Sequence, residues 1–118
     1  MTMKHYTGSC QCQAVTFEAD LDLDNTVICN CSRCRRLGSV LSFTPRDKFI
    51  LKTGADNLTE FRFNKKVIQH LFCKTCGIEA FGFGAMPDGS PVAAVNANCL
   101  DDVDARALKS HAYDGRAL

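Results

Sequence analysis

The sequence contains no tryptophan, only two tyrosines and three prolines, and no excess of either charge. Its 14 Lys and Arg residues nearly balance 13 Asp and Glu residues, so the formal net charge is +1. A near-neutral chain lacks the strongly basic surface typical of nucleic-acid binding, and we expect no nucleic-acid partner. No apolar run approaches the roughly 20 residues of a membrane-spanning helix, so we expect no membrane partner.

The sequence also lacks the features that divide a chain or direct its export. It has no internal repeat, no low-complexity stretch and no linker rich in Pro, Gly or Ser. Its first residues, MTMKHYTGSCQCQ, lack the apolar stretch of a signal peptide. With 118 residues, 46% of them hydrophobic, the chain has the size and composition of one globular domain. We therefore expect a single domain over residues 1–118, located in the cytoplasm.

What the sequence does have is eight cysteines, a high number for this length. Seven of them fall into three short motifs: C-x-C at Cys10 and Cys12, C-x-C-x-x-C at Cys29, Cys31 and Cys34, and C-x-x-C-G at Cys73 and Cys76. Only Cys99 stands alone. A reducing compartment disfavours disulfides, whereas this spacing is typical of metal ligands, and zinc is the metal that such thiolate sets bind. The spacing therefore predicts zinc as the cofactor.

The remaining pattern predicts an all-β fold with short helices. Hydrophobic and polar residues alternate over 15–20, as in a half-buried strand. Further strands are expected at 40–43, 49–52, 58–63, 67–72, 78–84 and 91–96, with turns at 54–57, 64–66 and 86–89. A short helix is expected over 33–37, capped by Ser32 and ended by Gly38, and a second candidate lies at 101–109. Many short strands predict stacked sheets or a partial barrel.

The cysteine motifs sort into two kinds of metal site, of which the first is closed. Structural zinc is usually bound by two short chelating pairs from distant parts of a chain. We expect such a pairing here, with Gly77 giving the second turn its conformational freedom. The expected four-thiolate site consists of Cys10, Cys12, Cys73 and Cys76.

The second expected site has three ligands, Cys29, Cys31 and Cys34. Three protein ligands with an open fourth position are typical of catalytic zinc. The open position can take water or a thiol, and a thiol bound to zinc is deprotonated and becomes a nucleophile at neutral pH. As an alternative, Cys99 or a histidine closes this group into a second structural site.

Three stretches resemble the signature of a known family. They are G-S-C-Q-C at 8–12, C-N-C-S-R-C-R-R at 29–36 and F-C-K-T-C-G at 72–77. They are similar to the glutathione-dependent formaldehyde-activating enzyme family (the GFA, or centromere protein V-type, family), and the likeness extends over residues 6–105. The resemblance implies stacked β-sheets, also found in a small zinc-binding guanine-nucleotide-exchange chaperone. It also implies a structural zinc on the closed site and a catalytic zinc on the three-cysteine site.

The activity that the resemblance implies is the joining of glutathione and formaldehyde into S-hydroxymethylglutathione, a carbon–sulfur lyase reaction. The expected partners are therefore a small thiol such as glutathione and a small aldehyde. This sequence departs from the family in two respects. Gln13 stands where a glycine usually follows the first motif, and the chain is shorter than the family's formaldehyde-activating enzymes. These differences bear on the local turn and on substrate identity more than on metal binding.

Further candidate residues surround the motifs. Arg33 and Arg36 would share a helix face and bind the anionic thiol, or else form a solvated surface. His70 is expected to be partly buried without binding metal, and Cys99 is also expected to be a non-ligand. Two rival functions remain open at this point: a zinc-stabilised binding module without catalysis, and a thiol-dependent redox enzyme that uses Cys99.

Overall fold

The structure is a computed structural model that describes residues 3–62 and 68–117. Its strands are β1 (Lys4–Ser9), β2 (Thr16–Leu21), β3 (Thr26–Cys29), β4 (Leu41–Pro45), β5 (Phe49–Thr53), β6 (Leu58–Phe61), β7 (Gln69–Cys73), β8 (Phe81–Ala85), β9 (Pro91–Asn96) and β10 (Ser110–Tyr113). The α-helix in this described part is α1 (Cys34–Leu37). Short 3₁₀ turns occupy Leu23–Asn25, Arg46–Lys48, Ala97–Cys99, Ala105–Ala107 and Gly115–Ala117. Across both described ranges, no helix is long and apolar enough to cross a bilayer.

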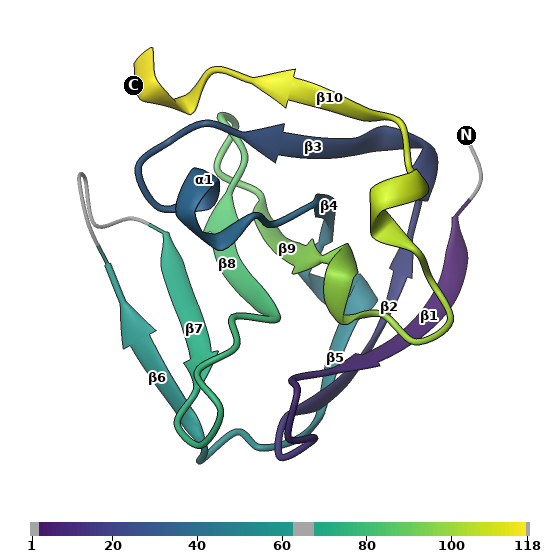
Figure 1. The fold of residues 1–118 in the computed structure, drawn as a ribbon, viewed down its shortest axis with the longest axis vertical. Coiled ribbons are helices and arrows are strands. Elements are labelled where there is room, and N and C mark those ends of the chain that lie inside the picture. Colours follow the sequence, from purple (N-terminus) through teal and green to yellow (C-terminus); the bar gives the residue numbers. More distant parts are fainter. Residues whose placement is uncertain (1–2, 63–67, 118) are drawn as a thin grey trace.

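The strands form two sheets (Figure 1). The smaller has the order β1-β2-β5, and the larger has the order β10-β3-β4-β9-β8-β7-β6. Neighbouring strands are antiparallel except for β10, which pairs in parallel with β3. The parallel pair brings the C-terminal strand beside the strand that ends at Cys29. The sheet order thus places the last residues of the chain next to one of the cysteine motifs.

Aromatic side chains from both sheets form the centre of the core. Phe17 of β2 stacks on Phe49 of β5, with ring centroids 5.4 Å apart. Phe81 of β8, in the other sheet, lies 4.7 Å from the Phe49 ring and 5.7 Å from the Phe17 ring. Phe17 and Phe81 are almost completely buried, and burial of such a side chain contributes about 1.5–3 kcal/mol. The prediction of an all-β fold with stacked sheets is therefore confirmed.

Most predicted strands are present, with some changes in their bounds. The alternation over 15–20 corresponds to β2, in which Phe17, Ala19 and Leu21 are buried. The expected hairpin is observed as the antiparallel pair β6 and β7, while its predicted turn at 64–66 lies outside the described residues. The sequence interpretation missed β1, β3 and β10. The last of these exposes three of its four residues, so hydrophobic alternation does not mark it.

Three local predictions were wrong. Residues 101–109 form only a single 3₁₀ turn, because Asp102 has a positive φ of 60° and Asp104 is extended. The strand expected at 78–84 begins at Phe81, because Ile78 still belongs to the turn after β7, where its carbonyl accepts from the amide of Cys73, the last residue of β7. Ser32 does not cap α1. Arg33 occupies the N-cap position without a side-chain cap bond.

Candidate metal centres

Four cysteines from two distant turns converge at one end of the sheets. Cys10 and Cys12 lie in the turn between β1 and β2, Cys73 is the last residue of β7, and Cys76 follows in the next turn. Their sulfur atoms all lie within 4.8 Å of one another. The Cys12 sulfur is 3.7 Å from that of Cys10 and 3.6 Å from that of Cys73. Four sulfurs around one zinc ion, each at about 2.3 Å, would be about 3.8 Å apart, so this group fits zinc.

Hydrogen-bond donors surround the sulfurs of this four-cysteine group. The Val15 amide donates to the Cys10 sulfur at 3.4 Å. The Cys73 sulfur accepts from the Thr75 amide at 3.3 Å and from Asn57 Nδ2 at 3.4 Å. Such donors stabilise thiolates, which are the form that binds metal. The group is therefore arranged to hold negative sulfur atoms inside a closed set of ligands.

The pKa values of this group agree with that arrangement in part. Burial opposes ionisation of Cys76, but the amides of Cys12 and Ile78 donate to its sulfur and lower its pKa to about 6. The amide of Cys76 itself is the main cause that lowers the pKa of Cys73. For Cys12, the Ala14 amide favours the thiolate, but burial and the neighbouring sulfurs prevail and raise its pKa to about 11. Mutual repulsion of thiolates is what a divalent cation would relieve.

The turns that carry these cysteines use positive φ angles. Gly77 has φ of 79°, as expected from its place after Cys76. Gln13 has φ of 68°, although it is not a glycine. The first motif therefore keeps a turn of the kind that a glycine would favour, with a side chain in a backbone region that costs roughly 1–2 kcal/mol.

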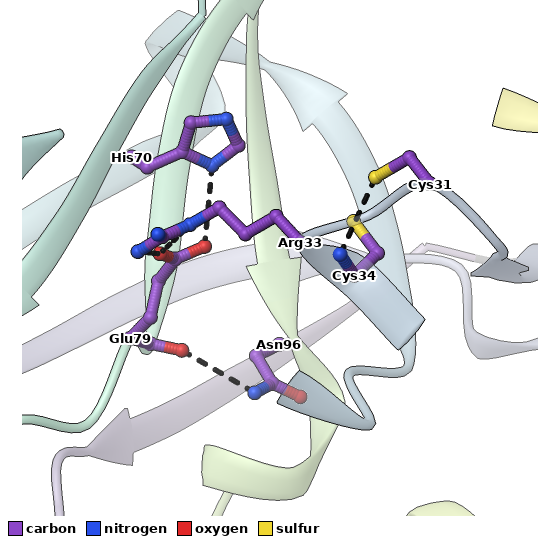
Figure 2. Close-up of polar contacts among 6 residues, drawn as sticks. All are labelled: Cys31, Arg33, Cys34, His70, Glu79 and Asn96. Carbon is purple, nitrogen blue, oxygen red and sulfur yellow. Dashed lines mark hydrogen bonds and ion pairs between the residues drawn. The ribbon is translucent and has the colours of Figure 1, made fainter. Parts of the chain in front are cut away.

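A second group of three cysteines lies in and beside the loop between β3 and α1. Cys29 ends β3, Cys31 is in the loop, and Cys34 is the first residue of α1. Their sulfurs lie within 4.8 Å of one another, and all three residues are partly buried. The Cys31 amide donates to the Cys29 sulfur at 3.4 Å, and the Cys34 amide donates to the Cys31 sulfur at 3.3 Å (Figure 2 shows the latter). The Cys34 amide therefore donates to the Cys31 sulfur and not to Ser32, the residue expected to cap the helix.

The three sulfurs differ in how easily they ionise. Burial opposes ionisation of Cys31, but the Cys34 amide and the two neighbouring thiols donate to it and lower its pKa. Burial is the main cause that raises the pKa of Cys34 to about 12, and the Cys31 sulfur adds to it. The group therefore holds one favoured thiolate and one protonated thiol, and a metal ion would be needed to ionise all three.

No fourth side chain completes this three-cysteine group among residues 3–62 and 68–117. Cys99 is separate from both groups, and burial, followed by the nearby Cys10 and Cys76, raises its pKa to about 11. A partly buried thiol with a raised pKa is unlike a reactive one. His70 is also separate from both groups. It is buried, with Nδ1 3.4 Å from Glu79 Oε2.

Glu79 links the three-cysteine loop to the turn after β7. Its Oε1 accepts from Arg33 Nη2 at 2.6 Å and from Arg33 Nε at 3.0 Å. Figure 2 shows the Arg33 side chain extending from the cysteine loop to this carboxylate, with His70 beyond it. The Glu79 carbonyl also accepts from Asn96 Nδ2 at 3.3 Å. Sequence reasoning missed Glu79, because no motif or spacing relates it to a residue 46 positions earlier.

The two candidate arginines differ in their surroundings. The charge of Arg33 is balanced by Glu79, and its guanidinium lies 4.7 Å from the centre of the Phe61 ring. Arg36 donates from Nη1 to the Ser32 carbonyl at 2.7 Å and has no ion pair with the described residues. Both line a pocket of about 380 Å³ at α1, together with Ser32, Leu37 and Phe61. The positive charge left for an anion in this pocket is that of Arg36.

Stacked β-sheets with one closed cysteine group and one open group define a β protein that could hold two metal ions. Comparison with known families identifies it more closely. The sequence matches the model of the glutathione-dependent formaldehyde-activating enzyme family over residues 5–115, and the chain belongs to that family. The resemblance inferred from the cysteine motifs is thereby confirmed.

A solved structure supports the same fold. The crystal structure of a Rhodobacter sphaeroides protein from a structural genomics programme is 31% identical in sequence, with a TM-score of 0.77. The match covers 85% of this chain and 92% of that chain. The similarity therefore extends over most of both proteins.

Proposed function

We propose that this protein is a zinc-dependent carbon–sulfur lyase-type enzyme that joins a small thiol such as glutathione to a small aldehyde such as formaldehyde. The observation that carries the proposal is the pair of cysteine groups, one closed and one open, in a member of this family. In the reaction, the thiol sulfur forms a bond to the carbonyl carbon, and the thiol proton is transferred to the aldehyde oxygen. No electrons are exchanged, so no redox partner is required.

The two groups would have different tasks. Cys10, Cys12, Cys73 and Cys76 would hold a structural zinc, and Cys29, Cys31 and Cys34 would hold a catalytic zinc. A zinc ion held by Cys29, Cys31 and Cys34 would favour the thiolate form of a substrate thiol. All eight cysteines are free in the structure, which agrees with a reducing compartment such as the cytoplasm.

The residues of the neighbouring pocket would bind and orient the thiol substrate. Glutathione carries two carboxylates, and the guanidinium of Arg36, which has no ion pair among the described residues, would offer one of them a charged partner. Arg33 contributes to the same wall, but Glu79 fixes its guanidinium against Phe61. We therefore assign the anion contact to Arg36 and a positioning role to Arg33. The apolar side chains of Leu37 and Phe61 would exclude water from the stem of the substrate.

Exchange NMR between free glutathione and its formaldehyde adduct tests this function, because the adduct also forms without any enzyme. We expect the native protein to accelerate exchange. The Cys31→Ser variant should give the same rate as a sample without protein. Cys99→Ser is the control and should retain the native rate, whereas a redox enzyme based on Cys99 would lose its activity. Equal rates in native, Cys31→Ser and protein-free samples would refute the lyase proposal and favour a binding module.

A further inference from the structure

The C-terminal segment lies against the three-cysteine loop. β10 runs parallel to β3, with Tyr113 opposite Cys29 in the register (Figure 1). At the other end of the pair, Thr26 and Ser110 join their hydroxyl groups at 2.8 Å, and Thr26 is fully buried. The strand is thus fixed at both ends, and the residues after it continue past the end of β3 toward the cysteines.

Asn30, which lies between two of the cysteines, binds this segment through three hydrogen bonds. Its backbone amide donates to the Tyr113 carbonyl at 3.2 Å. Its side-chain Nδ2 donates to Asp114 Oδ1 at 2.9 Å, and its Oδ1 accepts from the Arg116 amide at 3.0 Å. One asparagine therefore uses both ends of its amide group to hold residues 113–116 against the loop that carries the three thiols.

Gly115 makes the closest approach. A Cβ atom at this position would lie 2.5 Å from the Cys29 sulfur and 3.1 Å from the Cys31 Cβ. Real Cβ atoms essentially never come closer than 3.0 Å to a heavy atom of this kind. Gly115 does not have a positive φ, so the constraint is contact with the cysteines and not the backbone conformation. A side chain here would push the segment away from the sulfur.

We propose that residues 113–116 form one wall of the open metal centre, with Gly115 and Asn30 as positioning residues for Cys29 and Cys31. The wall contacts the Cys29 sulfur and the Cys31 side chain, so chelating ligands that approach the thiols from the side of the C-terminal segment are hindered. This inference rests on the proposed function insofar as the three cysteines hold zinc.

Release of zinc to a colorimetric chelator, followed with time, tests the wall without measuring catalysis. The native protein should release two ions in two phases, and the phase missing in Cys31→Ser belongs to the open centre. We expect Gly115→Ala and Asn30→Ala to accelerate that phase about tenfold, the usual effect of removing an outer contact of a ligand. The other phase and the denaturation midpoint should not change.

Two variants make the result specific. Gly84→Ala is the matched glycine control, because its Cβ would meet only Ile68 Cγ1 at 3.7 Å, and it should leave both phases unchanged. Asn57→Ala removes the donor to the Cys73 sulfur and should accelerate the other phase instead. If Gly115→Ala and Asn30→Ala release two ions at the native rates, the proposed wall is refuted while the proposed function stands. A native protein that holds a single ion, on the four-cysteine group, would overturn both.

Discussion

Both cysteine groups offer sulfur atoms as ligands, but the two groups differ in what they connect in the fold. The four-cysteine group joins the turn after β1 to the turn after β7, so its ligands are up to 66 positions apart, from Cys10 to Cys76. The three-cysteine group spans only Cys29 to Cys34, so a metal ion there would link residues that are already close neighbours in the chain. A metal ion in the first group would hold the sheets together. In the second it would be held by a local loop and leave a position for chemistry.

Burial differs between the groups in part. In the four-cysteine group, Cys10 and Cys73 are 2% and 1% exposed and belong to the hydrophobic core, whereas Cys76 is partly buried and Cys12 is exposed. The cysteines of the open group are all partly exposed, and side chains of the same loop and helix, Ser32, Arg33, Arg36 and Leu37, line a pocket. The comparison teaches that the number of sulfurs and their distances are not enough to separate the two roles. What separates them is where the ligands come from in the chain and what lies beside them.

The largest expected effect follows from a change in the four-cysteine group, the structural group of this comparison. Cys10→Ser should leave the protein largely unfolded at 25 °C, because zinc binding to such a site is worth about 10–16 kcal/mol at neutral pH. That amount is comparable to the whole stability of a small domain, about 5–15 kcal/mol. Circular dichroism during urea titration, together with the zinc content, measures the result.

The matched control is Cys31→Ser in the open group. It should lose one zinc ion per chain and keep a cooperative unfolding transition, because the loop connects only neighbouring residues. If both variants unfold alike, or if Cys10→Ser folds like the native protein, the division into structural and open groups is wrong.

A smaller effect tests how the open group is fixed to the rest of the fold. Glu79→Gln removes the charge that Arg33 faces at 2.6 Å, in a pair whose side chains are only 21% and 13% exposed. We expect a loss of about 2 kcal/mol in the free energy of unfolding, because a half-buried guanidinium is left without its partner. Thiol binding should weaken as well, since the pocket wall loses its fixed arginine. Urea denaturation and calorimetric titration with glutathione measure the two effects.

Glu60→Gln is the control for this prediction. Glu60 pairs with Arg62 at 2.8 Å, but both side chains are about two-fifths exposed, and solvent screens such a pair. It should change stability little and leave thiol binding unaltered. Equal effects of the two variants would show that Glu79 has no particular role in holding the cysteine loop.

These two regions also show what a sequence can reveal. The cysteine groups could be predicted because chelating pairs are local: C-x-C and C-x-x-C place two sulfurs together whatever the rest of the chain does. Glu79 and Gly115 could not be predicted, because their contacts with Arg33 and Cys29 depend on sheet order over 46 and 86 positions. The helix expected at 101–109 failed for a related reason. Its polar side chains form local hydrogen bonds with the backbone that favour extended and turn conformations. The segment has no periodic apolar face that would favour a helix instead.

The smallest expected effect concerns the turn of the closed group. Gln13 holds a positive φ of 68° directly after Cys12, where the family usually has glycine. Gln13→Gly should relieve this strain and raise the free energy of unfolding by about 0.5–1 kcal/mol, after the greater entropy of glycine in the unfolded chain is deducted. Asp102 offers the comparison, since its φ of 60° lies in the same region and Asp tolerates that region better. Asp102→Gly should therefore gain less. A loss of stability in Gln13→Gly, measured by urea denaturation of the zinc-loaded protein, would mean that the glutamine side chain itself supports the turn beside the metal ligands.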